Sequence, residues 1–427
     1  MFLSIVIAFL ALLAIGMPIG FTLGISGILG LYLMGSGVTL FSMAPLQFFS
    51  SLDMFTLMAM PFFIFAGEIM NKGGITERLV RFSNILAGNI RGGLAHANII
   101  ASVFFAGMTG AAVSDTAAIG TMLIPAMKED GYDLDFSAAV TAASSIIGPT
   151  IPPSNMMVIY GSLMNVSIAG LFAAGFLPGL VLAGLLMLMT AFISWRRGYP
   201  KGLKTTFKDK ILGFRTAIIP LLMPVIILGG ILSGIFTPTE AAAVAVFYAM
   251  IVGFFVLKTI TPKDLIPMLI KTARITGTVF LIIGAAGILS WVLAINQVPQ
   301  AIAAFLLATT GNPKIILLLI LILMLIVGMF MDIAAALIIL GPILHPIAVS
   351  IGMSPIHFGI VMILSLNIAL MTPPVGACLF VACSISKLSL WQLSKAIWPY
   401  IIMEVIALFI VAYVPEISLF LPKLLGF

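Results

Sequence analysis

The sequence predicts an all-α polytopic membrane protein made of two inverted-topology repeats with re-entrant hairpins and broken helices. Composition is the first reason: 62% of the 427 residues are hydrophobic and only 8% are charged, whereas a soluble domain carries about 25% charged residues. The second reason is that apolar stretches long enough to cross about 30 Å of hydrocarbon as helices recur from end to end. A membrane β-barrel would show short alternating segments instead. The third reason is an internal repeat.

The first repeat is expected to occupy residues 1–195. No Lys or Arg precedes the first apolar run and no small-residue cleavage pattern follows it, which favours a retained span over a signal peptide. Three scaffold spans are expected within residues 2–70, at 2–16, 18–35 and 53–70. They are followed by a hairpin at 94–127, a broken span at 136–165 and a span at 168–195.

The second repeat is expected at residues 217–427, after a polar cytoplasmic linker at 196–216. The polar linker is better explained as a topology signal than as a phosphate or nucleic-acid site. Scaffold spans are expected within 217–295, at 217–235, 239–257 and 272–295. A hairpin at 314–348, a broken span at 356–386 and a last span at 391–413 follow.

Basic residues predict the orientation. With both termini in the periplasm, every one of the 20 Lys and Arg residues except Lys314 and Lys423 falls on the cytoplasmic side, as the positive-inside rule requires. Each half then contains an odd number of full crossings. The two halves are therefore expected to have opposite orientations in the membrane.

The repeat is visible residue by residue at an offset of 221 positions. Gly and Pro dominate the matches, which are Gly107 with Gly328, Met108 with Met329, Gly120 with Gly341, Pro125 with Pro346, Gly131 with Gly352, Ser144 with Ser365 and Pro178 with Pro399. The pair Pro152-Pro153 likewise returns as Pro373-Pro374. Inverted repeats with interrupted helices at matching places are typical of secondary transporters and indicate where they bind their cargo.

The two Pro-Pro breaks predict binding sites within the membrane. Proline removes a backbone donor and leaves carbonyls unpaired, and such groups persist in hydrocarbon only against protein, water or an ion. Sodium is a natural partner for these carbonyls. The half-helix that follows each break presents its N-terminus, which suits an anionic substrate group, and Ser154 and Asn155 follow the first break.

Each hairpin turn carries one aspartate. The first turn holds Asp115 close to Thr109, Ser114 and Thr116, and Asp332 is the ionisable residue of the second. Charged residues at this depth mark ion pathways by default. Asp also commonly caps the start of a helix, so an ion ligand and an N-cap both remain open for each aspartate.

Other polar residues exclude some functions. Thr237 and Glu240 form a capping-box pattern, whereas Glu68 and Glu404 are open to a proton relay, a partner contact or an interfacial position. The sequence has no Walker-type loop, so nucleotide hydrolysis is not expected. Its scattered His and Asp residues do not provide the nucleophile and base or the metal cluster that an intramembrane enzyme would need. No intramembrane Lys or Arg is expected to hold a carboxylate, so helix ends, hydroxyls and bound cations must do so.

The motifs resemble the large membrane subunit of tripartite ATP-independent periplasmic (TRAP) transporters. The resemblance covers essentially the whole chain. It is carried by "MPFFIFAGEIM" (60–70), "GGLAHANIIASVFFAGMTGAAVSDTAAIG" (92–120), "IGPTIPPSN" (147–155), "GIFTPTEAAAVAV" (234–246), "GMFMDIAAALIILGPILHPIA" (328–348) and "MTPPVG" (371–376).

The resemblance implies an elevator-type ion-transporter fold with amphipathic arm helices at about 75–90 and 298–310. It implies Na+-driven import of an organic acid, a dicarboxylate or a sialic acid for example, across the bacterial inner membrane. A soluble periplasmic substrate-binding protein would deliver the acid. A small four-span membrane subunit is also implied, as a separate chain because this sequence begins at its own first span.

The resemblance also implies residues for each site. Ligands of one Na+ are expected among Gly107, Thr109, Asp115, Ser144, Ser145, Gly148 and Pro149. Ligands of a second are expected among Gly328, Asp332, Met371, Thr372 and Pro373. The substrate is expected near Thr116, Ser154, Asn155 and Asn367. The alternative is a stand-alone Na+-coupled carboxylate or ion transporter that needs no binding protein.

Overall fold

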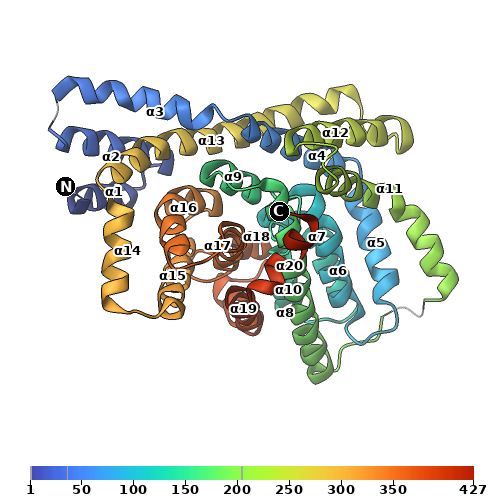
Figure 1. Cartoon of the computed structure of the whole chain (residues 1–427). Helices are drawn as coiled ribbons and strands as arrows, with labels where there is room; N and C mark the ends of the chain where they lie inside the picture. The colour runs from blue at the N-terminus through green and yellow to red at the C-terminus, as the bar shows by residue number, and fades with distance from the viewer. Residues whose placement is uncertain (1, 36, 203–204) are drawn as a thin grey trace.

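A computed structural model describes residues 2–35, 37–202 and 205–427. These residues form helices joined by short connections, and an isolated β-bridge joins Arg91 to Lys201. Figure 1 shows a long layer of helices that runs across the molecule and contains α3, α4, α12 and α13. Two helices, α5 at one end and α14 at the other, lead from this layer to a body of hairpins and broken helices.

The long layer begins with the first four α-helices. They are α1 (Phe2–Ala14), α2 (Ile19–Leu33), α3 (Met43–Leu52) and α4 (Ala59–Lys72). Small residues let α2 approach α13: a β-carbon at Gly30 would lie 2.7 Å from Val292 and one at Gly27 would lie 2.8 Å from Ile288. Close approach at small residues is a usual way for helices to associate in membranes. Helix α3 was not predicted, because it is shorter than a crossing; its segment meets that of α4 at a bend of 58°.

The second part of the layer starts earlier than the sequence predicted. It consists of α11 (Phe207–Leu232), α12 (Pro238–Ile251), a π-helical turn (Val252–Val256) and α13 (Pro262–Ile295). Capping boxes at Thr206 and Thr261 start α11 and α13 about ten residues before the predicted spans. The predicted linker at 196–216 is therefore too long. The first turns of both helices carry charged residues, so a search for apolar stretches does not detect where the helices begin.

The body contains two similar sets of helices. The first set is α5 (Ile75–Ala87), α6 (Gly93–Thr109), α7 (Ala112–Glu129), α8 (Leu134–Ser145), α9 (Asn155–Met164) and α10 (Ile168–Arg197). The second is α14 (Val298–Thr309), α15 (Pro313–Gly328), α16 (Ile333–Ser350), α17 (Pro355–Ala369), α18 (Ala377–Ser386) and α19 (Leu390–Tyr413). The bounds of α7 and α16 differ by the repeat offset of 221 at both ends. A final helix, α20 (Pro415–Leu425), was not predicted because it is short and partly polar.

The two sets interlock. Helix α18 packs against α7, and α9 packs against α16, so the second half of each broken helix contacts the hairpin of the other set. Figure 1 shows these helices between α5 and α14, below the long layer. Each predicted site is consequently bordered by elements from both halves of the chain.

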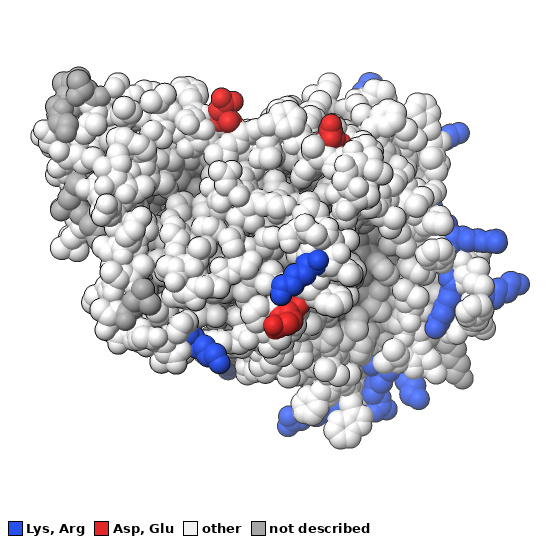
Figure 2. Space-filling model, in the orientation of Figure 1, with Lys and Arg blue, Asp and Glu red and all other residues white. Residues whose placement is uncertain are grey.

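The described helices are those of a multi-pass membrane protein. Six are long and apolar enough to cross a bilayer, or up to seven if the bent pair forms one span. Several hairpin and half-helices, such as α15 and α18, have only 10–17 residues and are shorter than the roughly 20 residues of a usual crossing. Figure 2 shows a face with few charges, on which Lys and Arg gather at the right-hand side, over α11 and its neighbours.

Candidate functional site: two helix breaks and the cavity beside them

The first helix break is a compact, buried turn. Helix α8 ends at Ser145, and the chain passes through the cis bond Pro152-Pro153 before α9 begins at Asn155. Inside the turn, the Ser154 hydroxyl donates a 2.7 Å hydrogen bond to the carbonyl of Pro149. Residues 146–154 are buried throughout. Backbone carbonyls of this turn therefore lie inside the protein, where only protein groups, water or an ion can satisfy them.

The tip of the first hairpin rests on this break. Gly110 has a φ of +58°, and a β-carbon there would lie 3.2 Å from the amide of Asn155 and 3.3 Å from the carbonyl of Pro153. A side chain at Gly110 would thus combine a left-handed backbone with a close contact. A β-carbon at Gly107 would lie 3.6 Å from Pro153 and 2.8 Å from Pro224. The predicted apposition of hairpin tip and break is present in the first half.

Asp115 lies directly against the break. Its side chain is fully buried in the first turn of α7, and a β-carbon added to Gly148 would overlap its carboxylate. The N-cap residue of α7 is Ala111, so Asp115 itself does not occupy that position. A carboxylate beside the carbonyl-rich turn at 146–151 is a suitable partner for a hard cation, which prefers oxygen ligands.

The predicted ligands Ser144 and Ser145 take part in a polar network that the sequence analysis missed. Ser102 donates to Ser144 over 2.9 Å, Ser144 donates to Asn98 Oδ1 over 3.0 Å, and Asn98 Nδ2 donates to Thr141 over 2.6 Å. Ser145 donates to the Thr141 carbonyl within α8. The network ties α6 to α8. Its sequence signal is a set of Asn, Ser and Thr residues at intervals of three and four on facing helices. The side chain of the predicted ligand Thr109 lies outside the described part of the structure.

The second break is more open. Met371 is buried, but Thr372 and Pro373 are half-buried and Pro374 and Val375 are exposed. The Thr372 hydroxyl donates a 2.8 Å hydrogen bond to the carbonyl of Ile368 in α17. Gly328, at the hairpin tip, packs against Ala369 at the end of α17.

Asp332 is an N-cap, in contrast to Asp115. Its Oδ2 accepts a 3.0 Å hydrogen bond from the amide of Ala334, and its side chain is exposed. The capping alternative is therefore confirmed for Asp332, whereas Asp115 is not the N-cap residue of its helix. The described residues contain no group of three or more His, Cys, Asp or Glu side chains that could hold a metal ion. Any cation site here must rely mainly on backbone carbonyls and hydroxyls.

The four predicted substrate residues do not form one binding surface. Thr116 donates to the carbonyl of Ala112 and Ser154 to that of Pro149, and both side chains are fully buried. Asn367 is also buried, and its amide donates a 3.1 Å hydrogen bond to Thr150, which joins α17 to the first break. Of the four, Asn155 lines a cavity. The placing of the substrate near these four residues stays a prediction, and Asn155 is the member that borders this cavity.

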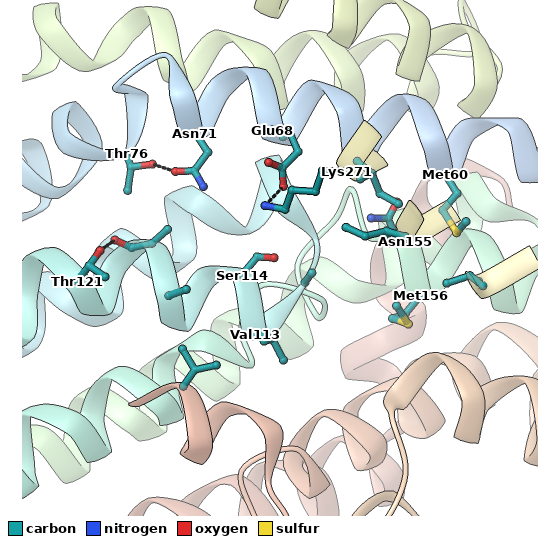
Figure 3. A pocket seen from close by; sticks show the side chains of 18 of the residues that line it. Met60, Glu68, Asn71, Thr76, Val113, Ser114, Thr121, Asn155, Met156 and Lys271 are labelled. Atoms are coloured by element: carbon teal, nitrogen blue, oxygen red, sulfur yellow. Dashed lines mark hydrogen bonds and ion pairs between the residues drawn. The ribbon is translucent and has the colours of Figure 1, made fainter. Parts of the chain in front are cut away.

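The cavity has a volume of about 740 Å³ and lies between the long layer and the body. Volumes of this size are usual for small-molecule sites. Its walls come from α4, α5, α7, α9, α13 and α18, and its polar lining residues are Glu68, Asn71, Thr76, Glu77, Ser114, Thr121, Asn155 and Lys271. Figure 3 shows Glu68 and Lys271 paired on one wall, across from Ser114 on α7. Lys271 also lines the cavity, and it lies on α13, which starts ten residues earlier than predicted.

Two other polar residues now have defined environments. The capping box predicted at Thr237 and Glu240 is confirmed by hydrogen bonds of 2.8 Å and 3.3 Å. Glu404 on α19 is fully buried, and neither of its carboxylate oxygens has a hydrogen-bond partner in the described part of the chain.

The fold is similar to those of two solved structures. It resembles the Alcanivorax borkumensis YdaH transporter with a TM-score of 0.63 at 14% identity, over 91% of this chain and 88% of that one. It also resembles Neisseria gonorrhoeae MtrF with a TM-score of 0.60 at 14% identity, over 89% of this chain and 84% of that one. At these identities the likeness shows the fold alone.

The chain belongs to the family of the tripartite ATP-independent periplasmic transporter DctM component, whose model matches residues 6–417. It is 41% identical to the sialic acid TRAP transporter large permease protein SiaM of Vibrio cholerae, over 98% of both chains. It is 36% identical to the C4-dicarboxylate TRAP transporter large permease protein DctM of Rhodobacter capsulatus, over 98% of both. It is 39% identical to the sialic acid TRAP transporter permease protein SiaT of Haemophilus influenzae, over 98% of this chain and 68% of that protein.

Proposed function

We propose that this chain is the large permease subunit of a Na+-coupled importer of an organic acid, in the bacterial inner membrane with both termini in the periplasm. A periplasmic substrate-binding protein delivers the acid, and a small four-span membrane subunit on a separate chain completes the complex. Membership of a tripartite family supports this assignment. The substrates in the relatives' names, a sialic acid and C4-dicarboxylates, define the acids to test.

The observation that carries the proposal is Asp115 against Gly148 at the first break. The Asp115 carboxylate is buried beside a turn whose backbone carbonyls also lie inside the protein. Carboxylate and carbonyl oxygens are the ligands that a hard cation prefers, so a Na+ ion would bind among Asp115 and the carbonyls near Pro149. Met371 and Thr372 would hold a second ion near the other break, with Asp332 nearer the surface. The Oδ1 of Asn367, buried and without a hydrogen-bond partner among the described residues, supplies a further oxygen between the breaks.

An elevator movement fits the arrangement of the helices. The helices of the long layer would form the scaffold, and α5 and α14 link this layer to the two hairpins. The cavity lies where these two parts meet. Movement of the body, with its two breaks, along the layer would open the cavity to either side of the membrane, and the inverted repeat provides two such arrangements of similar energy.

Uptake into proteoliposomes tests the proposal. Vesicles would contain this chain with its small subunit, under an inward Na+ gradient, and would receive labelled sialic acid or succinate with and without the binding protein. Uptake that requires Na+ and the binding protein is the expected result. Uptake without the binding protein would establish the stand-alone alternative, and uptake that ignores Na+ would refute the coupling. Asp115→Ala and Asp332→Ala are expected to weaken the Na+ dependence while the protein still inserts.

A further inference from the structure

A cation of the scaffold faces the candidate cavity. Lys271 Nζ on α13 lies 2.7 Å from Glu68 Oε1 on α4. Both residues line the cavity, and Ser114 on α7 and Asn155 on α9 line its opposite side. Figure 3 shows the Lys271–Glu68 pair directed into the space between the two walls.

The pair is suited to exchange. The Lys271 side chain is 56% exposed and that of Glu68 is 18% exposed. Solvent-exposed ion pairs contribute little to stability, because water screens the attraction between the two charges. An incoming oxyanion can therefore take the place of Glu68 on the ammonium group. Glu68 would then be left in contact with water rather than as a buried, unpaired charge.

The lining has a defined charge balance. Among the described residues of the lining, Lys271 is the one basic residue, and Glu68 and Glu77 are the acidic residues. A ligand with a single oxyanion can face Lys271 and keep its remaining surface toward neutral groups such as Asn71, Ser114 and Asn155. A dianion of similar size would place its second charge near the glutamates, where like charges repel.

We propose that Lys271 is an anion-binding residue of the scaffold that takes the carboxylate or sulfonate of the transported acid in exchange for Glu68. This rests on the proposed function and deepens it, since the charge balance selects organic monoanions over dicarboxylates. The cavity shares its end of the molecule with Lys72 and Arg78, which line adjoining pockets. In the proposed orientation this is the cytoplasmic end, so Lys271 binds the acid before its release.

Ligand binding to the purified complex of this chain and its small subunit tests the proposal. Thermal unfolding in Na+ would be followed while sialic acid, isethionate or succinate is titrated. For the wild type, we expect half-saturation at lower concentration with at least one of the two monoanions than with succinate. Lys271→Met should raise the half-saturating concentration of that monoanion about tenfold, the factor for about 1.4 kcal/mol. Lys271→Arg should bind as the wild type does, and Glu68→Gln should improve succinate binding.

Arg274→Met is the matched control, because it removes a basic residue from the same helix outside the cavity lining. If Lys271→Met unfolds, Lys271→Cys treated with 2-aminoethyl methanethiosulfonate restores an ammonium group and should restore binding, with reagent-treated wild type as its reference. Equal binding by wild type and Lys271→Met, tighter binding of succinate, or no binding of any of the three acids overturns the inference. Na+-driven uptake is scored separately, so a wild type that binds through Lys271 but does not transport would refute the proposed function alone.

Discussion

The first and second helix breaks share a Pro-Pro pair and a nearby aspartate, yet their surroundings differ. At the first break the chain is buried, the hairpin tip at Gly110 touches it, and Asp115 lies against Gly148. At the second break Pro374 is exposed, and Asp332 caps its own helix. Similar sequence signatures therefore produce one closed and one open site. The difference suggests unequal roles for the two aspartates.

The largest expected effect is at Gly148, where a β-carbon would overlap the Asp115 carboxylate. The position that corresponds to it in the second half is Ala369, which already carries a β-carbon. Gly148→Ala would place a methyl group on the Asp115 carboxylate. We expect loss of Na+-dependent uptake and a decrease in the free energy of unfolding of about 1–3 kcal/mol, as for overpacked cores. Gly277→Ala is the control, since nothing lies within 4 Å of a β-carbon there. If Gly148→Ala needs the same Na+ concentration as the wild type for half-maximal uptake, Na+ binding does not depend on the position of Asp115 against Gly148.

The second prediction separates the two aspartates. Asp115→Asn should raise the Na+ concentration for half-maximal uptake about tenfold or more, equivalent to about 1.4 kcal/mol, because the buried charge is lost. Asp332→Asn should have a smaller effect, since Asn caps helices as well as Asp does, whereas Asp332→Ala should lower stability by about 1 kcal/mol. Sodium titrations of uptake with thermal unfolding measure both. Equal effects of the two Asn variants on Na+ would remove the proposed difference.

The third prediction concerns Glu404, which lies on a helix packed against α8 of the first half and α17 and α18 of the second. Both its oxygens are buried without hydrogen-bond partners in the described chain. Glu404→Met should therefore raise the free energy of unfolding by about 1–3 kcal/mol, while Glu404→Gln, which keeps unpaired polar atoms, should gain less. Thermal unfolding in Na+ and in K+ measures this. A Glu404→Met protein that is less stable only in Na+ would instead identify an ion at Glu404.

The smallest effect is expected at Asp133, in the connection between α7 and α8. A 2.7 Å hydrogen bond from Tyr199, followed in importance by contacts with Arg197, lowers the pKa of Asp133 despite some desolvation. Stability from a carboxylate with a lowered pKa is present above its unfolded value of about 3.9 and is lost as pH falls through the folded value. Tyr199→Phe should thus lower stability by less than about 1 kcal/mol at neutral pH.

Unfolding of Tyr199→Phe and wild type across pH checks this prediction. The difference between them should shrink below about pH 4, once Asp133 is protonated. A difference that persists in acid would assign the effect to packing of the Tyr199 ring on Phe136 and Tyr132.

Sequence alone determined the helical membrane class and the place of each break. Long apolar runs predict helices because hydrocarbon leaves no other way to satisfy the backbone. Pro and Gly predicted the hairpin turns and the two helix breaks, at 147–155 and 371–376, because the backbone preferences of these residues act locally. The predicted hairpin at 94–127 and the observed helices α6 and α7 differ by at most two residues at their outer ends.

Tertiary structure decided which polar residues meet. Asp115 and Asp332 are similar in sequence context, but one lies against a distant turn and the other caps its own helix. Lys271 reaches the cavity because a charged first turn extends α13, which apolar counting could not detect. The Asn98–Ser144–Thr141 network and the Asn367–Thr150 contact join residues on different helices. Such contacts depend on how helices pack and rotate against each other, which local patterns of hydropathy, Gly and Pro do not specify.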